Sequence, residues 1–275
     1  MRKKINFARR NMKIGSILLI IGVLALGSCS PLSKVMKSND YEYKYRMAEQ
    51  FYAKKQYNNA QQIYEDLFPV FKGSQRFEDL YYKYAYCHYY LKDYFQAENL
   101  FKGFLDVFPS SPKSEEVDYM HAYCYYKQSP KPQLDQSNTV KAMGMLQTFI
   151  NTHPGSERNK EALEIIEKCK VKLETKQSDA AQLYYNVGQF RASAIAYTGV
   201  LNEYPESSRG DEYKLMVIKS YYKFANLSIQ ERQKERYEQV INEVHDFQDR
   251  YPESKLLKDA EGYLTLSQNK IKKLN

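Results

Sequence analysis

Tryptophan is absent from this 275-residue sequence, and cysteine and histidine occur only four times each. Sugar-binding sites favour the large tryptophan ring, so its absence counts against a glycan-binding protein. The four histidines, His88, His121, His153 and His245, are scattered, and none has a second ligand at the spacing of a metal site. Glycine-rich phosphate-binding loops and serine elbows are also missing. We therefore predict no enzyme, no metal site and no bound cofactor.

Long apolar runs are missing too, apart from one near the start of the chain. It covers the 15 residues from Ile14 to Ser28, whereas a membrane-spanning helix needs about 20. Six basic residues precede it, which is typical of a secretory signal peptide. The end of the run, Leu26-Gly27-Ser28-Cys29, resembles a bacterial lipobox. The resemblance implies that residues 1–28 are removed and that Cys29 receives lipid, including palmitate, which anchors the protein to a membrane.

The net charge of +8 arises largely from that leader. The sequence has 41 lysines and arginines against 33 aspartates and glutamates, and six of the basic residues lie in the leader, which has no acidic residue. The mature chain therefore keeps 35 basic and 33 acidic residues, a net charge of +2. Nucleic-acid binding needs a basic patch that persists in the folded domain. We predict no nucleic-acid partner.

Three cysteines remain once Cys29 is assigned to lipid: Cys87, Cys124 and Cys169. An odd count in an oxidising compartment argues against a disulfide framework. Cys87 and Cys124 both follow the dipeptide Ala-Tyr. This matching context favours small packing residues in two copies of one repeat, and a disulfide between these two cysteines is the alternative.

Prolines divide the mature chain at similar intervals, each after an aromatic residue or a histidine. They are Pro69, Pro109, Pro154, Pro205 and Pro252, with spacings of 40, 45, 51 and 47 residues. A proline after a helical pattern is expected to end the helix. Internal periods of this length indicate an array of helical repeats.

Small residues recur on a fixed grid within these units. In three units, a small residue is followed by a second one 12 residues later, with an aromatic residue three positions before the second. The pairs are Ala48 and Ala60, Ala85 and Ala97, and Ala181 and Ser193. This grid resembles the tetratricopeptide repeat, in which small residues let the two helices of a pair approach closely. Apolar residues at three- and four-residue spacing predict amphipathic helices throughout.

We therefore predict an all-α fold, a right-handed superhelix of about five tetratricopeptide-like helix pairs with a C-terminal capping helix. The lipidated Cys29 and a short, polar, flexible tether occupy residues 29–40, and the repeat domain covers residues 41–275. The expected repeats are 41–73, 76–112, 115–156, 158–208 and 210–254, with the cap at 256–274. The third pair has a longer, proline-containing loop, and the fifth has extra residues around 227–234.

Tyrosine is abundant, with 27 residues, and it forms two stripes at helical spacing. The stripes are Tyr41, Tyr45 and Tyr52 on the first expected helix of repeat one, and Tyr82, Tyr86 and Tyr89 on that of repeat two. The first helix of each pair normally lines the concave face of such a superhelix. One hypothesis is a groove that binds peptide segments; the other, which a helical aromatic stripe favours, is ordinary core between helices.

The order of the motifs resembles the outer-membrane assembly lipoproteins of the BamD (YfiO) type. The resemblance rests on the lipobox, on Val117-Asp118-Tyr119-Met120, on residues 178–192, and on residues 200–207, which end a helix in Tyr-Pro. It implies a periplasmic scaffold of the β-barrel assembly machinery. The C-terminal repeats would dock the periplasmic domains of the barrel-forming partner, and the N-terminal repeats would engage unfolded barrel substrates.

Two candidate docking residues lie near the start of repeat five. Arg209 and Asp211 occupy the region where the family has a partner-contacting arginine, although the register does not match. Ser30 follows Cys29, where lipoproteins retained in the inner membrane often have aspartate, so we expect the periplasmic face of the outer membrane. The alternatives are a pilotin-like lipoprotein, another envelope adaptor, or a lipoprotein that captures ligands for an outer-membrane transporter.

Overall fold

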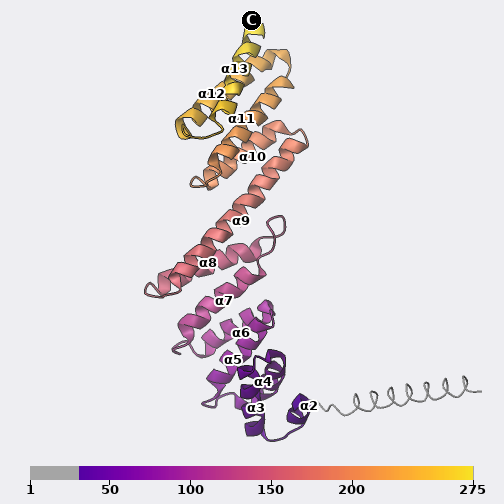
Figure 1. Ribbon diagram of the computed structural model, residues 1–275, viewed down its shortest axis with the longest axis vertical. Helices are drawn as coiled ribbons and strands as arrows, with labels where there is room; N and C mark the ends of the chain where they lie inside the picture. Colours follow the sequence, from indigo (N-terminus) through magenta and orange to yellow (C-terminus); the bar gives the residue numbers. More distant parts are fainter. Residues whose placement is uncertain (1–30, 275) are drawn as a thin grey trace, which may run out of the picture. The chain divides into compact units, whose positions relative to one another are not determined.

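A computed structural model describes residues 31–274, so the predicted signal peptide and the predicted lipid site Cys29 lie outside the described residues. The described part is all-α, as predicted, and contains no strand (Figure 1). Its helices are α2 (Pro31–Met36), α3 (Tyr41–Ala53), α4 (Tyr57–Phe71), α5 (Phe77–Tyr90), α6 (Tyr94–Val107), α7 (Ser114–Gln128), α8 (Ser137–Thr152), α9 (Asn159–Asn186), α10 (Phe190–Glu203), α11 (Gly210–Asn226), α12 (Gln230–Arg250) and α13 (Leu257–Leu274).

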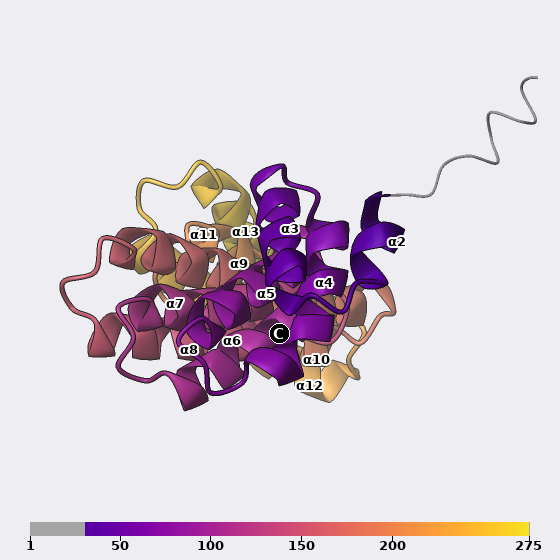
Figure 2. The ribbon, with the colours of Figure 1, turned by 90° about the horizontal axis from the view of Figure 1, so that it is seen from below.

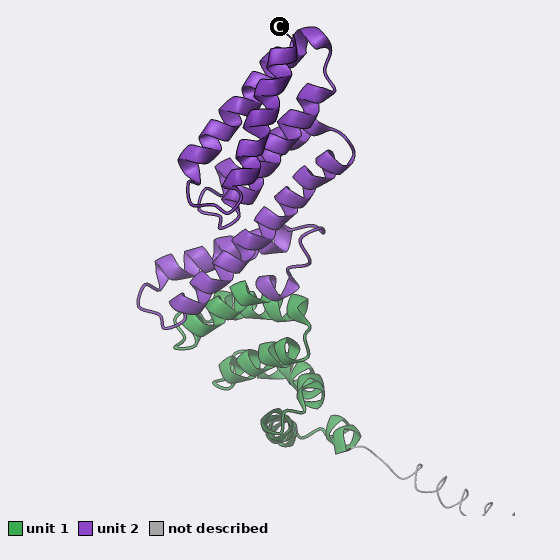
Figure 3. Cartoon of the chain, turned by 45° about the horizontal axis from the view of Figure 1, so that its top comes forward, with its two compact units in different colours: residues 1–124 green, residues 125–275 purple. Residues whose placement is uncertain are grey.

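The chain forms two compact units, divided between Cys124 and Tyr125 within α7 (Figure 3). In unit 1, α3 packs against α4, α4 against α5, and α5 against α6. In unit 2, each helix from α8 to α13 packs against the next. The helices of each unit therefore pack in sequential pairs, which confirms the tetratricopeptide-like arrangement predicted from the small-residue grid.

The small residues of the grid lie where paired helices cross. All six are fully buried. In unit 2 the hydroxyl of Ser193 also donates a hydrogen bond to the backbone carbonyl of Ala181, at 3.0 Å. A larger side chain at these positions would force the two helices apart, because protein cores have little free space.

The turns inside three of the pairs share one backbone conformation. Lys55, Lys92 and Gly188 have φ angles of 57°, 65° and 79°. The residue after each donates its backbone N–H to the carbonyl five residues earlier, at 2.8–2.9 Å. These bonds satisfy carbonyl groups that the helix end leaves unpaired. The shared geometry sets a short, tight connection between the two helices of each pair.

Pro69 does not end its helix, contrary to the prediction, because α4 continues to Phe71. Phe71 is only 7 % exposed, and its ring stacks on that of Tyr45 with 5.4 Å between centroids. This packing keeps the last turn helical although proline cannot donate a backbone hydrogen bond. The other four predicted stops are confirmed, since α6, α8, α10 and α12 each end two residues before a proline.

Part of the expected flexible tether is ordered, which corrects the prediction for residues 31–36. These residues form α2, which packs against α3 and α4 (Figure 2). The contact is apolar, because Val35 is 1 % exposed. The polar composition of the segment as a whole concealed this single buried side chain.

Unit 2 contains a helix twice as long as those of a typical repeat. α9 has 28 residues, and it packs against both α8 and α10. The sequence has neither glycine nor proline between Asn159 and Asn186, so nothing in it interrupts the helix. The extra residues of the fifth pair extend its helices and form a three-residue turn, from Leu227 to Ile229.

Candidate functional site

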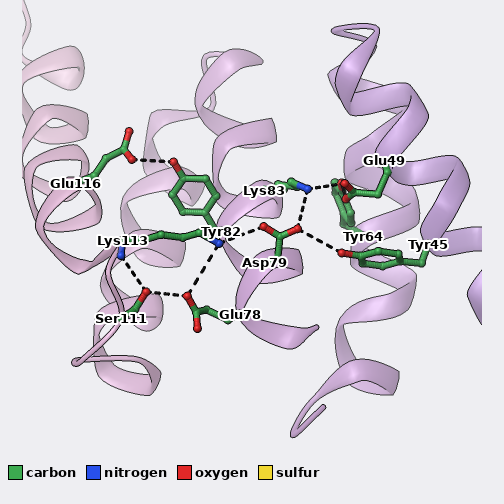
Figure 4. A network of polar contacts seen from close by, with 10 residues as sticks. All are labelled: Tyr45, Glu49, Tyr64, Glu78, Asp79, Tyr82, Lys83, Ser111, Lys113 and Glu116. Atoms are coloured by element: carbon green, nitrogen blue, oxygen red, sulfur yellow. Dashed lines mark hydrogen bonds and ion pairs between the residues drawn. The ribbon is translucent and has the colours of Figure 1, made fainter. Parts of the chain in front are cut away.

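A chain of polar contacts joins the first helices of successive repeats in unit 1, and we call it the polar ladder. Figure 4 shows its central part. It contains five pairs of residues that lie 34 positions apart: Glu42–Arg76, Tyr45–Asp79, Glu49–Lys83, Asp79–Lys113 and Tyr82–Glu116. Equivalent positions in unit 1 are 37 residues apart, as in Ala48 and Ala85, so each pair joins a residue to one that lies three positions, about one helical turn, before its equivalent in the next repeat. The ladder therefore ties neighbouring repeats together.

Lys83 and Asp79 form the centre of the ladder. The Lys83 ammonium group lies between the carboxylates of Glu49 and Asp79, 2.7 Å from Asp79 Oδ2. Asp79 also accepts hydrogen bonds from Lys113 at 3.1 Å and from the Tyr45 hydroxyl at 3.3 Å.

Burial and hydrogen bonding act in opposite directions on these two groups. Burial alone would lower the pKa of Lys83, but its hydrogen bonds to Asp79 and Glu49 outweigh burial and raise that pKa. Burial would likewise raise the pKa of Asp79, and the hydrogen bonds from Lys83 and Lys113 lower it instead. Both residues are therefore charged near neutral pH.

Tyrosine hydroxyls cap the carboxylates of the ladder. Tyr82 and Tyr86 donate to the two oxygens of Glu116, at 2.9 and 2.8 Å. Tyr64 donates to Glu49 at 2.5 Å. Burial, followed by the hydrogen bond to Glu116, raises the pKa of Tyr82 to about 12. These bonds fix the orientation of the rings, so this surface is preorganised.

The six tyrosines predicted from the sequence differ in exposure. Tyr41 is 47 % exposed, whereas Tyr86 is 6 % exposed. The other four, Tyr45, Tyr52, Tyr82 and Tyr89, are partly buried. Tyr86 therefore belongs to the core between helices, while Tyr41 is available at the surface. Tyr45 and Tyr82 lie between these extremes. Each is partly buried and donates its hydroxyl to a carboxylate of the polar ladder.

Tyr52 and Tyr89 lie in a cluster of rings rather than on the ladder. The ring of Tyr52 meets that of Tyr57 edge-on, with 5.6 Å between centroids. The ring of Tyr89 meets that of Tyr94 in the same way at 5.8 Å. Burial raises the pKa of Tyr89 to about 12.

The predicted docking residues Arg209 and Asp211 lie in unit 2, at the start of α11. Arg209 is exposed, donates to Glu212 at 3.0 Å, and lies 4.9 Å from the ring centroid of Tyr213. Asp211 accepts a hydrogen bond from Ser254 at 2.6 Å and borders an open cavity of about 460 Å³. The guanidinium and the cavity give this end of α11 an accessible polar surface.

The charged members of the polar ladder were not among the residues predicted from the sequence. The signal was present, since Glu42 and Arg76, Glu49 and Lys83, and Asp79 and Lys113 are opposite charges 34 residues apart. A search for complementary charges at a constant offset of 34 residues would have found them.

Side chains of the types that bind metal ions are dispersed over the described residues. Within residues 31–274, no three His, Cys, Asp or Glu side chains are placed to share a metal ion. Two of the histidines have carboxylate partners. His88 Nδ1 lies 3.0 Å from Asp93, and His121 Nε2 lies 2.9 Å from Glu98. Both contacts lie within unit 1.

Comparison with known proteins identifies the family. The family model described as "YfiO: Outer membrane lipoprotein" matches residues 37–224, more than half of the chain. A search of curated proteins found no match. The helices of the described part include none long and apolar enough to cross a bilayer.

Solved structures of helical-repeat proteins show only distant similarity. The TPR2AB domain of yeast Sti1, in a complex with pHSP90, is 12 % identical, with a TM-score of 0.38 over 83 % of this chain and 98 % of that one. A human IFIT1 dimer with PPP-AAAA is 14 % identical, with a TM-score of 0.27 over 84 % of this chain and 58 % of that one. The family match, which agrees with the resemblance found in the sequence, is therefore the decisive comparison: this chain belongs to the YfiO family of outer membrane lipoproteins.

Proposed function

We propose that this protein is a lipid-anchored scaffold of the machinery that folds and inserts β-barrel proteins into the outer membrane. The family match over residues 37–224 carries the proposal, since membership suggests a role in outer-membrane protein assembly. As a member of this family the chain is a scaffold rather than an enzyme. Lipid on Cys29 would hold it on the periplasmic face of the membrane.

The finer proposal assigns a different partner to each unit. Unit 2 would dock the periplasmic domains of the barrel-forming protein through Arg209 and Asp211. The exposed guanidinium and the adjoining cavity support this role, because charged groups at an open edge steer association and set specificity. Unit 1 would engage unfolded barrel substrates through the surface around its tyrosine stripes. Its preorganised hydroxyls support this role, since rigid aromatic side chains lose little entropy on binding.

Affinity purification tests the proposal as a whole. The tagged full-length protein would be extracted from envelopes in mild detergent, and the proteins that copurify with it would be identified. We expect a large barrel protein with repeated periplasmic domains. Recovery of only a secretin would favour a pilotin, recovery of only a transporter would favour a ligand-capturing lipoprotein, and either result would overturn the proposal.

Matched variants test the assignment of the two surfaces. Arg209→Ala is expected to lower recovery of the barrel protein, and Arg232→Ala is its control. Both arginines are exposed, and both pair with a glutamate three residues later in unit 2, at 3.0 and 3.1 Å. Tyr41→Ala is expected to lower crosslinking to unfolded substrate, and Tyr184→Ala is its control, since Tyr184 is 45 % exposed. Equal losses in a variant and its control would contradict the corresponding assignment.

A further inference from the structure

One edge of unit 1 exposes aromatic and aliphatic side chains beside lysines. It lies at the two turns that join α3 to α4 and α5 to α6. Its apolar members are Tyr90, Leu91 and Phe95, which are 44 %, 41 % and 62 % exposed. Its basic members are Lys54, Lys55 and Lys92, all exposed. We call these six residues the turn edge.

A ring stack makes the two turns one continuous surface. Tyr57, at the start of α4, stacks on Tyr90, at the end of α5, with 4.3 Å between ring centroids and 21° between ring planes. The stack places the end of the first turn against the start of the second. The six residues of the turn edge therefore form a single patch.

The charge of the patch is positive. Asp93 is the only acidic residue in residues 53–59 and 89–97. Its carboxylate already accepts the Gln96 backbone N–H at 3.3 Å and lies 3.0 Å from His88 Nδ1. Within the described residues, the three lysines of the turn edge take part in no ion pair. Three lysines thus remain available to an anionic partner.

The backbone of the turns also singles out these lysines. Lys55 and Lys92 have positive φ angles, a conformation that glycine adopts most easily. The corresponding turn of unit 2 has Gly188 at this position. Lysine is therefore not the residue that the turn itself favours.

The attachment of α2 limits how far unit 1 can lie from the lipid anchor. α2 packs against α3 and α4 of the same unit and starts at Pro31. Cys29 is two residues earlier, and two residues span at most about 7 Å. Lipid on Cys29 would therefore hold unit 1 against the bilayer surface instead of on a long flexible leash.

We propose that the turn edge of unit 1 is a membrane-contact surface that lies on the anionic headgroups of the bilayer in which the lipid anchor is inserted. Tyrosine and other amphipathic aromatic residues favour the interface between water and hydrocarbon. Lysines near an anionic surface are attracted to it. The inference rests on the lipid anchoring in the proposed function, and it adds a second contact that fixes the orientation of unit 1 on the membrane.

A single tryptophan reports the contact, because the sequence has none of its own. The full-length lipidated protein would carry Phe95→Trp or, as a control, Val107→Trp. Both side chains are largely exposed, at 62 % and 51 %, and they lie near opposite ends of α6, about 18 Å apart along the helix. In vesicles of phosphatidylethanolamine and phosphatidylglycerol, we expect the F95W emission to shift to shorter wavelength. Brominated lipids in the same vesicles should quench that emission. V107W emission should not change. Equal responses from the two positions would overturn the proposal.

Charge substitutions test the anionic part of the proposal. In the F95W background, Lys54→Gln with Lys92→Gln should reduce quenching in vesicles that contain phosphatidylglycerol. Lys72→Gln with Lys102→Gln removes two exposed lysines elsewhere on unit 1 and should not. Unchanged quenching after Lys54→Gln with Lys92→Gln would overturn the anionic contact. A response of F95W only to added envelope proteins would instead make the turn edge a protein-docking surface and overturn membrane contact.

The experiment also separates this inference from the proposed function. The vesicles contain no other protein, so a negative result leaves docking to the barrel-forming partner unaffected. If neither tryptophan variant stays with the vesicles, the lipid anchor is absent, and the membrane-contact proposal is overturned with it.

Discussion

Lys83 on α5 forms an ion pair with Glu49 on α3, 34 residues earlier in the sequence. The Lys83 side chain is 21 % exposed, so the pair is largely shielded from water. Shielded pairs are screened by salt less than surface pairs are. This contact therefore contributes to the rigidity of unit 1 in a way that an exposed ion pair would not.

Lys83→Met is expected to destabilise the protein by about 1–2 kcal/mol, because it removes the charged hydrogen bonds of two partly buried carboxylates. Lys102→Met removes an exposed lysine from the same unit and should change stability by less than about 0.5 kcal/mol. Urea unfolding followed by far-ultraviolet circular dichroism measures both. Equal midpoints for the two variants would show that the polar ladder does not stabilise unit 1.

Tyrosine ionisation is expected to follow two phases at alkaline pH. Burial raises the pKa of Tyr45, Tyr82 and Tyr89 from 10.0 to about 12. Since the folded state holds the protonated form, these residues contribute stability that is fully present below pH 10.0 and is lost as the pH rises toward about 12. Absorbance of tyrosinate during a pH titration measures the phases. A single phase near the ordinary pKa, identical with that in urea, would contradict the burial of these hydroxyls.

The fold was largely predictable because its repeats depend on residue size at a few positions. Ala85 and Ala97 must be small for their helices to meet, and this requirement is visible in the sequence. Pro69 was misjudged because the packing of Phe71, which keeps its turn helical, depends on a ring in another helix. The docking of α2 was missed for a similar reason, since a single buried side chain leaves no periodic pattern.

The candidate site was less predictable than the fold. The tyrosine stripes were visible, but whether Tyr41 or Tyr86 is exposed depends on which neighbouring helix covers it. The ladder contacts depend on side-chain reach as well as on spacing. Tyr82 and Tyr86 share the carboxylate of Glu116, for example, although only Tyr82 lies 34 residues away from it.

Two glycine substitutions should change stability in opposite directions. Replacing a helix-interior glycine with alanine normally stabilises a helix by about 0.5–1 kcal/mol. Gly144→Ala in α8 should do so, since nothing lies within 4 Å of the added methyl group. At Gly103 in α6 the methyl would overlap the hydroxyl of Tyr81, whose ring is packed against Phe77 and Phe104 and cannot move away.

Gly103→Ala is therefore expected to destabilise unit 1 despite its better helix propensity. Tyr81→Phe removes the overlapping oxygen, and the next atom of that ring lies 3.3 Å from the added methyl. Gly103→Ala should therefore lower the free energy of unfolding less in the Tyr81→Phe background than in the unchanged protein. Thermal unfolding of the four proteins measures this cycle. If Gly103→Ala proved as stabilising as Gly144→Ala, the close approach of α6 to Tyr81 would be wrong.

Thiol reactivity tests both the core and the lipid anchor. Burial, followed by nearby carboxylates, raises the pKa of Cys87 and Cys124 to about 12, and burial also raises that of Cys169. The thiolate is the form that attacks thiol reagents, so these three buried cysteines, none of which forms a disulfide, should not react in the folded protein. In urea all three should react, and Cys87→Ser should remove one. A fourth reactive thiol in urea would show that Cys29 carries no lipid, since a thioether-linked sulfur cannot form a thiolate.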